Sequence, residues 1–430
     1  MDIKNIRREF HRYAETSWNE IRTSARVAEL LEKIGVKNIL VGKDVVDTKI
    51  LLDPVDMSVD KRNSNMKRAI EQGAPINWVK KTDGYPGVLG IINTKRPGPT
   101  YALRFDMDCL PYGEFNKEGY RPYDEGFNSL NPNCVHACGH DGHTAIGLGL
   151  AEHIIKNIGQ YKGVIKLIFQ PAEETTLGAQ SIVNKGHLDD VDIFLAIHLA
   201  LSAENVPLKS HMLVCGCKDF LSNRQLDVTF HGHAAHPCGA AQEGKNALLA
   251  ACSAALNLHC IAPHEKGIGR VNVGEISGGV CTNTIAPECT IKLEYRGEYQ
   301  EIVDYLEKRV FDILDGTART YDLTYSYVDH GEVPTSRSDD KLMELVRLNA
   351  KNVPWFQTVY FEGNLGGTDD AAIMMNKVKE NGGMASYIGI GTKTTAPLHN
   401  PKFDFDEKCL RPSIELLGFV IKNSDELNNL

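Results

Sequence analysis

The chain reads HACGHDGH from His136 to His143. The stretch holds three imidazoles, one thiol and one carboxylate, with two glycines between them. Thiolate and neutral imidazole groups together suit zinc or another first-row transition metal, and the glycines allow tight turns. The apolar positions between Thr144 and Lys156 predict a helix, whose N-terminal dipole favours a thiolate in the preceding loop.

Two interpretations of this stretch compete. A buried loop can contain satisfied histidines and an inert cysteine, but so many donor groups close together favour a metal site. A self-contained zinc finger would need two separated ligand pairs, and Cys134 and Cys138 have no matching pair downstream. We therefore expect the remaining ligands to come from elsewhere in the fold, in a catalytic site.

Composition restricts the class of protein. The 430 residues are enough for two domains with a substantial core. A net charge of −9 argues against a nucleic-acid binder. The first residues lack the apolar segment of a signal peptide, no segment approaches the length of a membrane span, and 11 cysteines do not form a disulfide framework pattern. We expect a soluble cytoplasmic protein.

Five short apolar segments read as strands: Val88–Ile92, Tyr101–Phe105, Val164–Phe169, Ile193–Ile197 and Tyr387–Ile390. Strands that alternate with helical patterns indicate an α/β fold with a mostly parallel sheet. Ligands of such sheets bind beyond the carboxyl ends of the strands. The polar residues at or after these ends are Asp106, Asp108, Glu173, Glu174, His198 and His399.

Each of these strand-end residues is weak evidence by itself. Adjacent carboxylates such as Glu173 and Glu174 are common on surfaces, but at a strand end one can bind a metal while the other faces the substrate as general base. His198 alone would more often be a buried histidine with a satisfied hydrogen bond. Asp108 suits either a ligand or a carboxylate that orients a ligating histidine.

Residues 219–332 have a different pattern. Apolar and polar residues alternate at Leu226–Phe230, as in a sheet with one covered face. Two helical patterns, the first over Asn246–Ala262, complete the order strand, helix, two strands, helix, strand, which fits a ferredoxin-like α+β unit. The last predicted strand belongs with the α/β part. We therefore expect an inserted domain between 1–218 and 333–430.

Several motifs together resemble one known family over essentially the whole chain. The matching segments are Phe10–Glu15, Arg104–Asp108, His136–Leu150, Gly163–Glu174, Ile261–His264, Arg270–Gly274 and Lys402–Glu407. The CGHDGH and PAEE elements, in this order and spacing, are highly specific. The chain resembles the M20 family of metallopeptidases, specifically its amidohydrolase branch.

The resemblance implies two divalent metal ions, manganese or zinc, in the α/β domain. Their ligands would be Cys138, His140, Glu174, His198 and His399, with the Cys138 thiolate placed to bridge. Asp108 would orient ligands without binding a metal. The metals would activate a water molecule, and Glu173 would be the general base that removes its proton and passes it to the departing amine.

For residues 219–332 the resemblance implies a lid and dimerisation domain. Gly232–His236 matches a motif whose last histidine reaches into an active site, usually that of the partner subunit, where His236 would stabilise the oxyanion. Asn283 and Arg296 match, more loosely, positions that contact substrate. The expected partner is a second copy of the chain or a homologous subunit, without nucleic acid or membrane.

The implied reaction is hydrolysis of the amide bond of an N-acyl amino acid, with p-aminobenzoyl-glutamate as the leading substrate. Two departures concern the substrate rather than the reaction: Gly367–Asp370 reads GTDD where the branch usually has GSED, and Pro237-Cys238 follows His236. The alternatives are a general N-acyl-amino-acid deacylase, a dipeptidase, a noncatalytic subunit of a heteromer, and a metal store. The complete ligand set with Glu173 argues against the noncatalytic subunit, and a metal store would require neither Glu173 nor His236.

Overall fold

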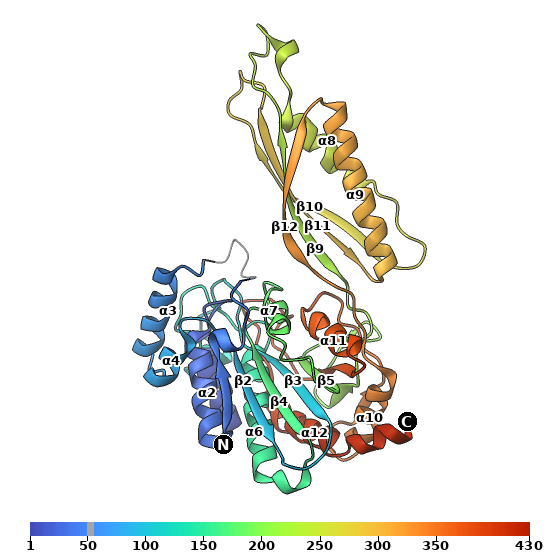
Figure 1. The fold of residues 1–430 in the computed structure, drawn as a ribbon. Helices are drawn as coiled ribbons and strands as arrows, with labels where there is room; N and C mark the ends of the chain where they lie inside the picture. Colours follow the sequence, from blue (N-terminus) through green and yellow to red (C-terminus); the bar gives the residue numbers. More distant parts are fainter. Residues whose placement is uncertain (50–55) are drawn as a thin grey trace. The chain divides into compact units, whose positions relative to one another are not determined.

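The computed structural model describes residues 1–49 and 56–430. Contacts divide the chain into two compact units: Met1–Asp219 with Ser336–Leu430, and Phe220–Thr335. The first unit has the α/β architecture predicted from the sequence, one large sheet with helices packed on it (Figure 1). None of the helices in the described ranges is long and apolar enough to cross a membrane.

The large sheet is mixed: its central strands pair in parallel as predicted, β13 pairs in parallel with β8, and antiparallel pairings join these strands to the rest of the sheet. Its order is β1-β2-β4-β3-β5-β14-β8-β13, in which β4, β3, β5 and β14 pair in parallel, whereas β1, β2 and β8 meet their inner neighbours antiparallel. A parallel connection needs a crossover of about a dozen residues or more, and the segment 94–99 between β2 and β3 is too short for one. The strands are β1 (Asn38–Val41), β2 (Val88–Asn93), β3 (Thr100–Asp106), β4 (Val164–Gln170), β5 (Ile193–Leu199), β8 (Met212–Val214), β13 (Thr358–Tyr360) and β14 (Met384–Ile390).

Helices cover both faces of this sheet. Phe105 and Arg104 are neighbours on β3 and so point to opposite faces; Phe105 lies against Gly147 of α6, and Arg104 donates to Asp370 at the start of α11. On the first face α6 packs with α1, α2 and α12, and on the second α11 packs with α7. The helices of this unit are α1 (Ile3–Arg12), α2 (Ile21–Ile34), α3 (Val59–Glu71), α4 (Ile76–Thr82), α5 (Arg121–Asp124), α6 (His140–Lys156), α7 (Gly178–Asn184), α10 (Asp340–Ala350), α11 (Ala371–Glu380) and α12 (Leu410–Lys422).

The close packing of α6 on β3 depends on a glycine. A Cβ atom at Gly147 would lie 2.6 Å from Cδ2 of Phe105, well inside contact distance. Only a residue without a side chain lets the helix approach the sheet this closely. Because His140 is the first residue of α6, this packing also fixes where the donor cluster meets the carboxyl ends of the strands.

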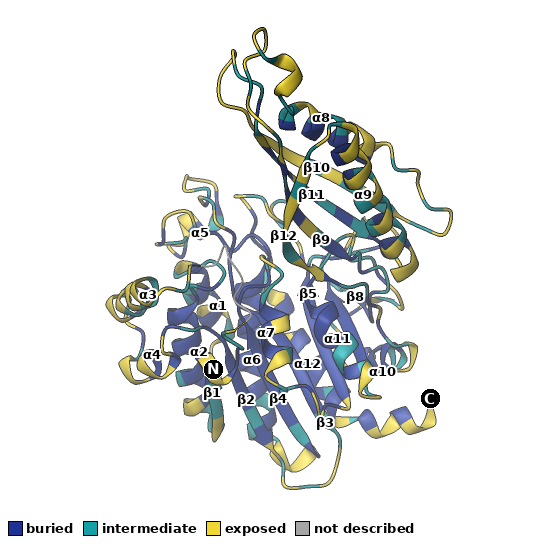
Figure 2. Cartoon of the chain, turned by 45° about the horizontal axis from the view of Figure 1, so that its top comes forward, coloured by how far each residue is buried: buried dark blue, intermediate teal, exposed yellow. Residues whose placement is uncertain are grey.

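The second unit consists of one sheet and two helices. Its antiparallel sheet has the order β10-β11-β9-β12, and helices α8 and α9 pack on one face of it (Figures 1 and 2). Leu226, Val228 and Phe230 of β9 are buried against the helices, as the alternating pattern predicts. The elements are β9 (Asn223–His231), α8 (Ala247–His259), β10 (Gly269–Gly278), β11 (Glu288–Gly297), α9 (Gln300–Thr320) and β12 (Thr324–Val333), the element order of ferredoxin-like units.

Candidate metal centre

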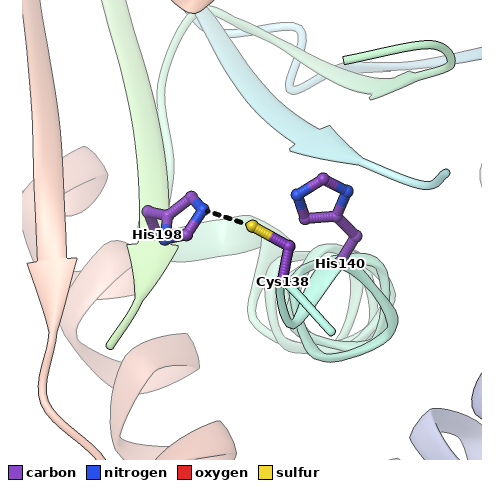
Figure 3. Close-up of side chains that lie close together, drawn as sticks. All are labelled: Cys138, His140 and His198. Carbon is purple, nitrogen blue, oxygen red and sulfur yellow. Dashed lines mark hydrogen bonds between the residues drawn. The ribbon is translucent and has the colours of Figure 1, made fainter. Parts of the chain in front are cut away.

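Cys138 and His140 flank the glycine at which helix α6 begins. Gly139 is the N-cap and has φ +92°, a left-handed conformation that glycine adopts without strain. From this turn the sulfur of Cys138 faces His198 on β5, and the ring of His140 lies on the other side of Cys138 (Figure 3). The Nδ1–H of His140 donates to the carbonyl oxygen of Asp108 at 3.0 Å. Its Nε2 is buried and has no hydrogen-bond partner among the described residues.

His198 completes the first group of donors. It lies on β5, and its Nδ1–H donates to the carbonyl oxygen of Leu199 at 2.7 Å. Its Nε2 then faces Cys138, with 3.4 Å between that nitrogen and Sγ (Figure 3). One ligand atom from each of Cys138, His140 and His198 lies within 4.8 Å of the others, and all three residues are buried.

Glu174 and His399 form a second group around the same sulfur. Ligand atoms of Cys138, Glu174 and His399 lie within 4.8 Å of one another, and 3.5 Å separates Nε2 of His399 from Oε2 of Glu174. Oε1 of Glu174 is buried without a hydrogen-bond partner in the described part of the chain. The structure therefore gathers all five predicted ligands into two groups that share Cys138, the arrangement that a bridged pair of cations would need.

Asp108 holds the backbone of the two glutamates. Its Oδ1 accepts from the N–H of Glu173 at 3.1 Å, and its Oδ2 accepts from the N–H of Glu174 at 3.0 Å and from the hydroxyl of Ser17 at 2.7 Å. Its carbonyl oxygen also orients His140. Asp108 thus positions two carboxylates and one imidazole without belonging to either donor group.

Both ring nitrogens of the third histidine of the motif, His143, take part in hydrogen bonds within the protein. His143 donates from Nδ1 to Oδ1 of Asp106 at 2.5 Å, and its Nε2 accepts from the N–H of Leu199 at 3.0 Å. Asp106 also accepts from the guanidinium of Arg104 at 2.6 Å. Asp106, His140 and His143 lie close enough together to suggest a metal group. Both ring nitrogens of His143 and both carboxylate oxygens of Asp106 are nevertheless engaged in hydrogen bonds within the protein, which leaves the two groups that share Cys138 as the better candidates.

The electrostatics of the cluster favour added positive charge. Burial raises the pKa of Cys138 well above its usual value, and the carboxylate of Glu174 raises it further. Burial also raises the pKa of Glu174 to about 7. At His140 burial lowers the pKa, but Asp106 and Cys138 together raise it well above that of a free imidazole. Bound cations stabilise deprotonated thiol and carboxyl groups, so this donor set fits divalent metal ions.

Glu173 lies beside this cluster and faces acidic neighbours. Oε2 of Glu173 is 3.8 Å from Nε2 of His140. Burial raises its pKa well above that of an exposed glutamate, and the charges of Asp369 and Glu174 raise it further. Without a cation Glu173 favours the protonated form, and positive charge at the neighbouring donors would return it to the carboxylate that can accept a proton.

A buried network around Asp369 was not predicted from the sequence. Carboxylate oxygens of Glu173, Asp369 and Asp370 lie within 4.8 Å of one another. Arg104 pairs with Asp369 at 3.1 Å and with Asp370 at 3.0 Å, and the Tyr387 hydroxyl donates to Asp369. The only feature of the sequence that pointed to this network was the GTDD segment at Gly367–Asp370. Nothing in that segment shows that its two aspartates lie next to Glu173 of the PAEE motif.

The three remaining predicted site residues lie in the second unit. His236 is exposed, and its Nδ1 accepts from the backbone N–H groups of Cys238 at 3.2 Å and Gly239 at 3.0 Å. Asn283 is also exposed. Arg296 pairs with Glu294 on the same strand at 3.0 Å. Their roles toward substrate stay predictions.

The sequence and the fold define the class of protein. Residues 102–423 match the family Peptidase family M20/M25/M40, and relatives at 35–41% identity span nearly the full chain. The chain therefore belongs to this family of hydrolytic enzymes, and the family expected from the sequence motifs is confirmed.

Particular relatives are similar along their whole length. Indole-3-acetyl-aspartic acid hydrolase of Enterobacter agglomerans is 41% identical over 98% of this chain and 95% of its own. One subunit of the p-aminobenzoyl-glutamate hydrolase of Escherichia coli (strain K12) is 39% identical over the same shares. The crystal structure of the aminobenzoyl-glutamate utilization protein from Klebsiella pneumoniae superposes with a TM-score of 0.79 at 36% identity, over 98% of this chain and 96% of that one.

Proposed function

We propose that this chain hydrolyses the amide bond between an aromatic acyl group and an acidic amino acid, with p-aminobenzoyl-glutamate as the leading substrate. The observation that carries the reaction type is the intact set of five donors together with a buried glutamate beside them. The substrate class is supported by the names of two relatives, which both denote amides of this kind. Their similar identities make indole-3-acetyl-aspartate the second candidate.

Two divalent metal ions would be held by the donors that share Cys138. Thiolate and imidazole ligands favour zinc, and the family resemblance also allows manganese. Bound metals would polarise the amide carbonyl and lower the pKa of the attacking water. The protein orients the donors by turning the Nε2 atoms of His140 and His198 toward the donor group, because backbone carbonyls accept from both Nδ1–H groups.

Glu173 would act as the base and then as the acid. Its carboxylate would take a proton from the attacking water and deliver it to the nitrogen of the departing amino acid. Asp108 supports this role because it fixes the backbone N–H of Glu173 at 3.1 Å. Glu173 itself is buried, which limits the access of bulk water to its carboxylate.

The second unit would supply groups that contact the substrate. Nδ1 of His236 accepts two backbone N–H groups, so the proton of the neutral ring resides on Nε2, which is then a donor toward an oxyanion. Asn283 and Arg296 would bind the amino acid or acyl part. We assign this unit the lid and dimerisation role, and its partner would be a homologous subunit or a second copy of the chain.

The test is substrate comparison with the purified full chain, loaded with manganese or with zinc. Amino acid release is measured from p-aminobenzoyl-glutamate, indole-3-acetyl-aspartate and N-acetyl-glutamate, the last as a match that lacks the aromatic group. We expect the two aromatic substrates to be cleaved with higher kcat/KM than N-acetyl-glutamate. Preference for N-acetyl-glutamate would favour a general deacylase, and no turnover despite bound metal would favour a noncatalytic subunit.

A further inference from the structure

Two cysteines face each other immediately behind the metal centre. Cys109 follows Asp108, and Cys134 lies four positions before Cys138. The N–H of Leu110 donates to the carbonyl of Val135 at 3.1 Å, and the reverse bond measures 3.2 Å. In this antiparallel bridge Cys109 and Cys134 occupy diagonal positions on the same face. Both are free thiols, and the two sulfurs lie close enough for each to shift the pKa of the other.

A third segment of the chain fixes the pair. The N–H of Cys109 donates to the carbonyl of Glu15 at 2.9 Å, and the N–H of Thr16 donates to the sulfur of Cys134. Arg68 of α3 is held by Glu15, at 2.6 Å between NH2 and Oε1. Nε of Arg68 is buried and has no hydrogen-bond partner among the residues described. A backbone donor and a cation are therefore arranged around one of the two sulfurs.

The two thiols differ in reactivity. The hydrogen bond from Cys109 lowers the pKa of Cys134, and the charge of Arg68 and the N–H of Thr16 lower it further. Burial raises the pKa of Cys109 well above its usual value. Cys134 is partly exposed, whereas Cys109 is only 2% exposed. A partly exposed thiol whose pKa is lowered, beside a buried thiol, is the arrangement of redox-sensitive cysteine pairs.

We propose that Cys109 and Cys134 are a redox-active dithiol that hydrogen peroxide converts to a disulfide, which lowers turnover at the adjacent metal centre. The Cys134 thiolate attacks one peroxide oxygen, the O–O bond breaks, and the other oxygen leaves as water after protonation. The Cys109 sulfur then attacks the sulfenic acid on Cys134, the S–O bond breaks as the S–S bond forms, and the thiol proton leaves with the hydroxide as a second water. The two thiols lose two electrons, and the peroxide gains them.

The effect on turnover follows from the position of Asp108. A disulfide brings the two sulfurs to about 2.05 Å and restricts the separation of the two backbones. Because Cys109 adjoins Asp108, this movement is transmitted to the carboxylate that holds the N–H groups of Glu173 and Glu174. This second part rests on the proposed function, whereas disulfide formation does not.

The primary test maps the bond in the full chain loaded with manganese or zinc. The protein is treated with hydrogen peroxide, remaining thiols are alkylated, and tryptic peptides are analysed by mass spectrometry without reduction. We expect the peptide of Cys109 to be joined to that of Cys134, and dithiothreitol to release both. The latter peptide also contains Cys138, so fragmentation must identify the bonded residue. An alkylated Cys109 after complete oxidation of Cys134, or a bond to Cys138, would overturn the proposal.

Variants separate the bond from its consequence. Cys109→Ala should accumulate sulfenic acid on Cys134, detected with dimedone, and Cys134→Ser should form no bond. With p-aminobenzoyl-glutamate, peroxide should reduce wild-type turnover on the order of tenfold, the size expected when a hydrogen-bond partner of a metal site is displaced. Cys134→Ser should keep its turnover, and Cys260→Ser, which removes an exposed cysteine of the second unit, should respond like the wild type. If peroxide inactivates Cys134→Ser as strongly as the wild type, the disulfide does not control turnover. If the enzyme shows no measurable turnover, disulfide formation is still tested by the peptide mapping.

Discussion

The two units present their predicted site residues in opposite surroundings. In the first unit Cys138, His140 and His198 are buried, and hydrogen bonds from neighbouring elements fix both histidine rings. In the second unit His236 and Asn283 are exposed and take part in hydrogen bonds within their own loops. A site that is preorganised should bind metal by itself, whereas exposed groups act only when substrate or a partner reaches them. Metal binding and turnover should therefore respond differently to changes in the two units.

The largest expected effect comes from Glu173→Gln. Loss of a general base should lower kcat on the order of 10²–10⁴-fold, while the metal content stays that of the wild type because the donors are intact. Metal content is measured by mass spectrometry of the elements, and kcat by release of glutamate. Near-normal turnover would remove Glu173 from the base role.

His236→Ala should lower turnover by about 10²–10³-fold, the effect of losing one oxyanion donor, again without loss of metal. His233→Ala is the matched control, because it removes an exposed histidine of the same loop. Mixing His236→Ala protein with Glu173→Gln protein tests whether His236 acts in the active site of its own chain or in that of the partner. Restored activity shows that His236 acts in the partner's site, and no restoration places it in the site of its own chain.

Asp108→Asn should have a smaller effect, about 10–100-fold in metal affinity or turnover. The amide cannot accept both backbone N–H groups in the way the carboxylate does. Ser17→Ala removes only one neutral hydrogen bond to Asp108 and should cost less. A larger loss from Ser17→Ala than from Asp108→Asn would show that the carboxylate does not organise the two glutamates.

The smallest effect concerns pH. Ligands must lose their protons to bind metal, and burial raises the pKa of Glu174 to about 7. The protonated form therefore competes below about pH 7, so metal affinity should fall as pH falls through that value, by about tenfold per pH unit for each proton displaced. Titration calorimetry between pH 6 and pH 8 measures this change in metal affinity. Affinity that rises toward pH 6 would contradict the assignment of Glu174 as a ligand.

The strands that carry the site could be predicted from the sequence, but their directions could not. The apolar segments Val164–Phe169 and Ile193–Ile197 became β4 and β5 almost unchanged, because buried central strands form continuous apolar runs. The direction of β2 depends on the short connection to β3, and the three-residue strands β8 and β13 are too short to leave a pattern in the sequence.

The candidate site shows the same division. Cys138 and His140 could be found because they lie close together in sequence, and Glu174, His198 and His399 because a known motif order relates them. Asp369 stood out only as part of the GTDD departure, and its contact with Glu173 could not be predicted because it comes from a loop before α11 and meets Glu173 only through the fold. The role of Arg104 could not be predicted either, because it lies within an apolar strand and most of the carboxylates that balance its charge are distant in sequence.

The most direct test measures bound metal and turnover on the same sample of purified full-length chain. Reconstituted with zinc or manganese, the protein should bind two equivalents and release glutamate from p-aminobenzoyl-glutamate, and Cys138→Ser should lose both properties together because its sulfur is common to both donor groups. Retention of two metal equivalents and of turnover by Cys138→Ser would contradict a bridged metal centre at this site.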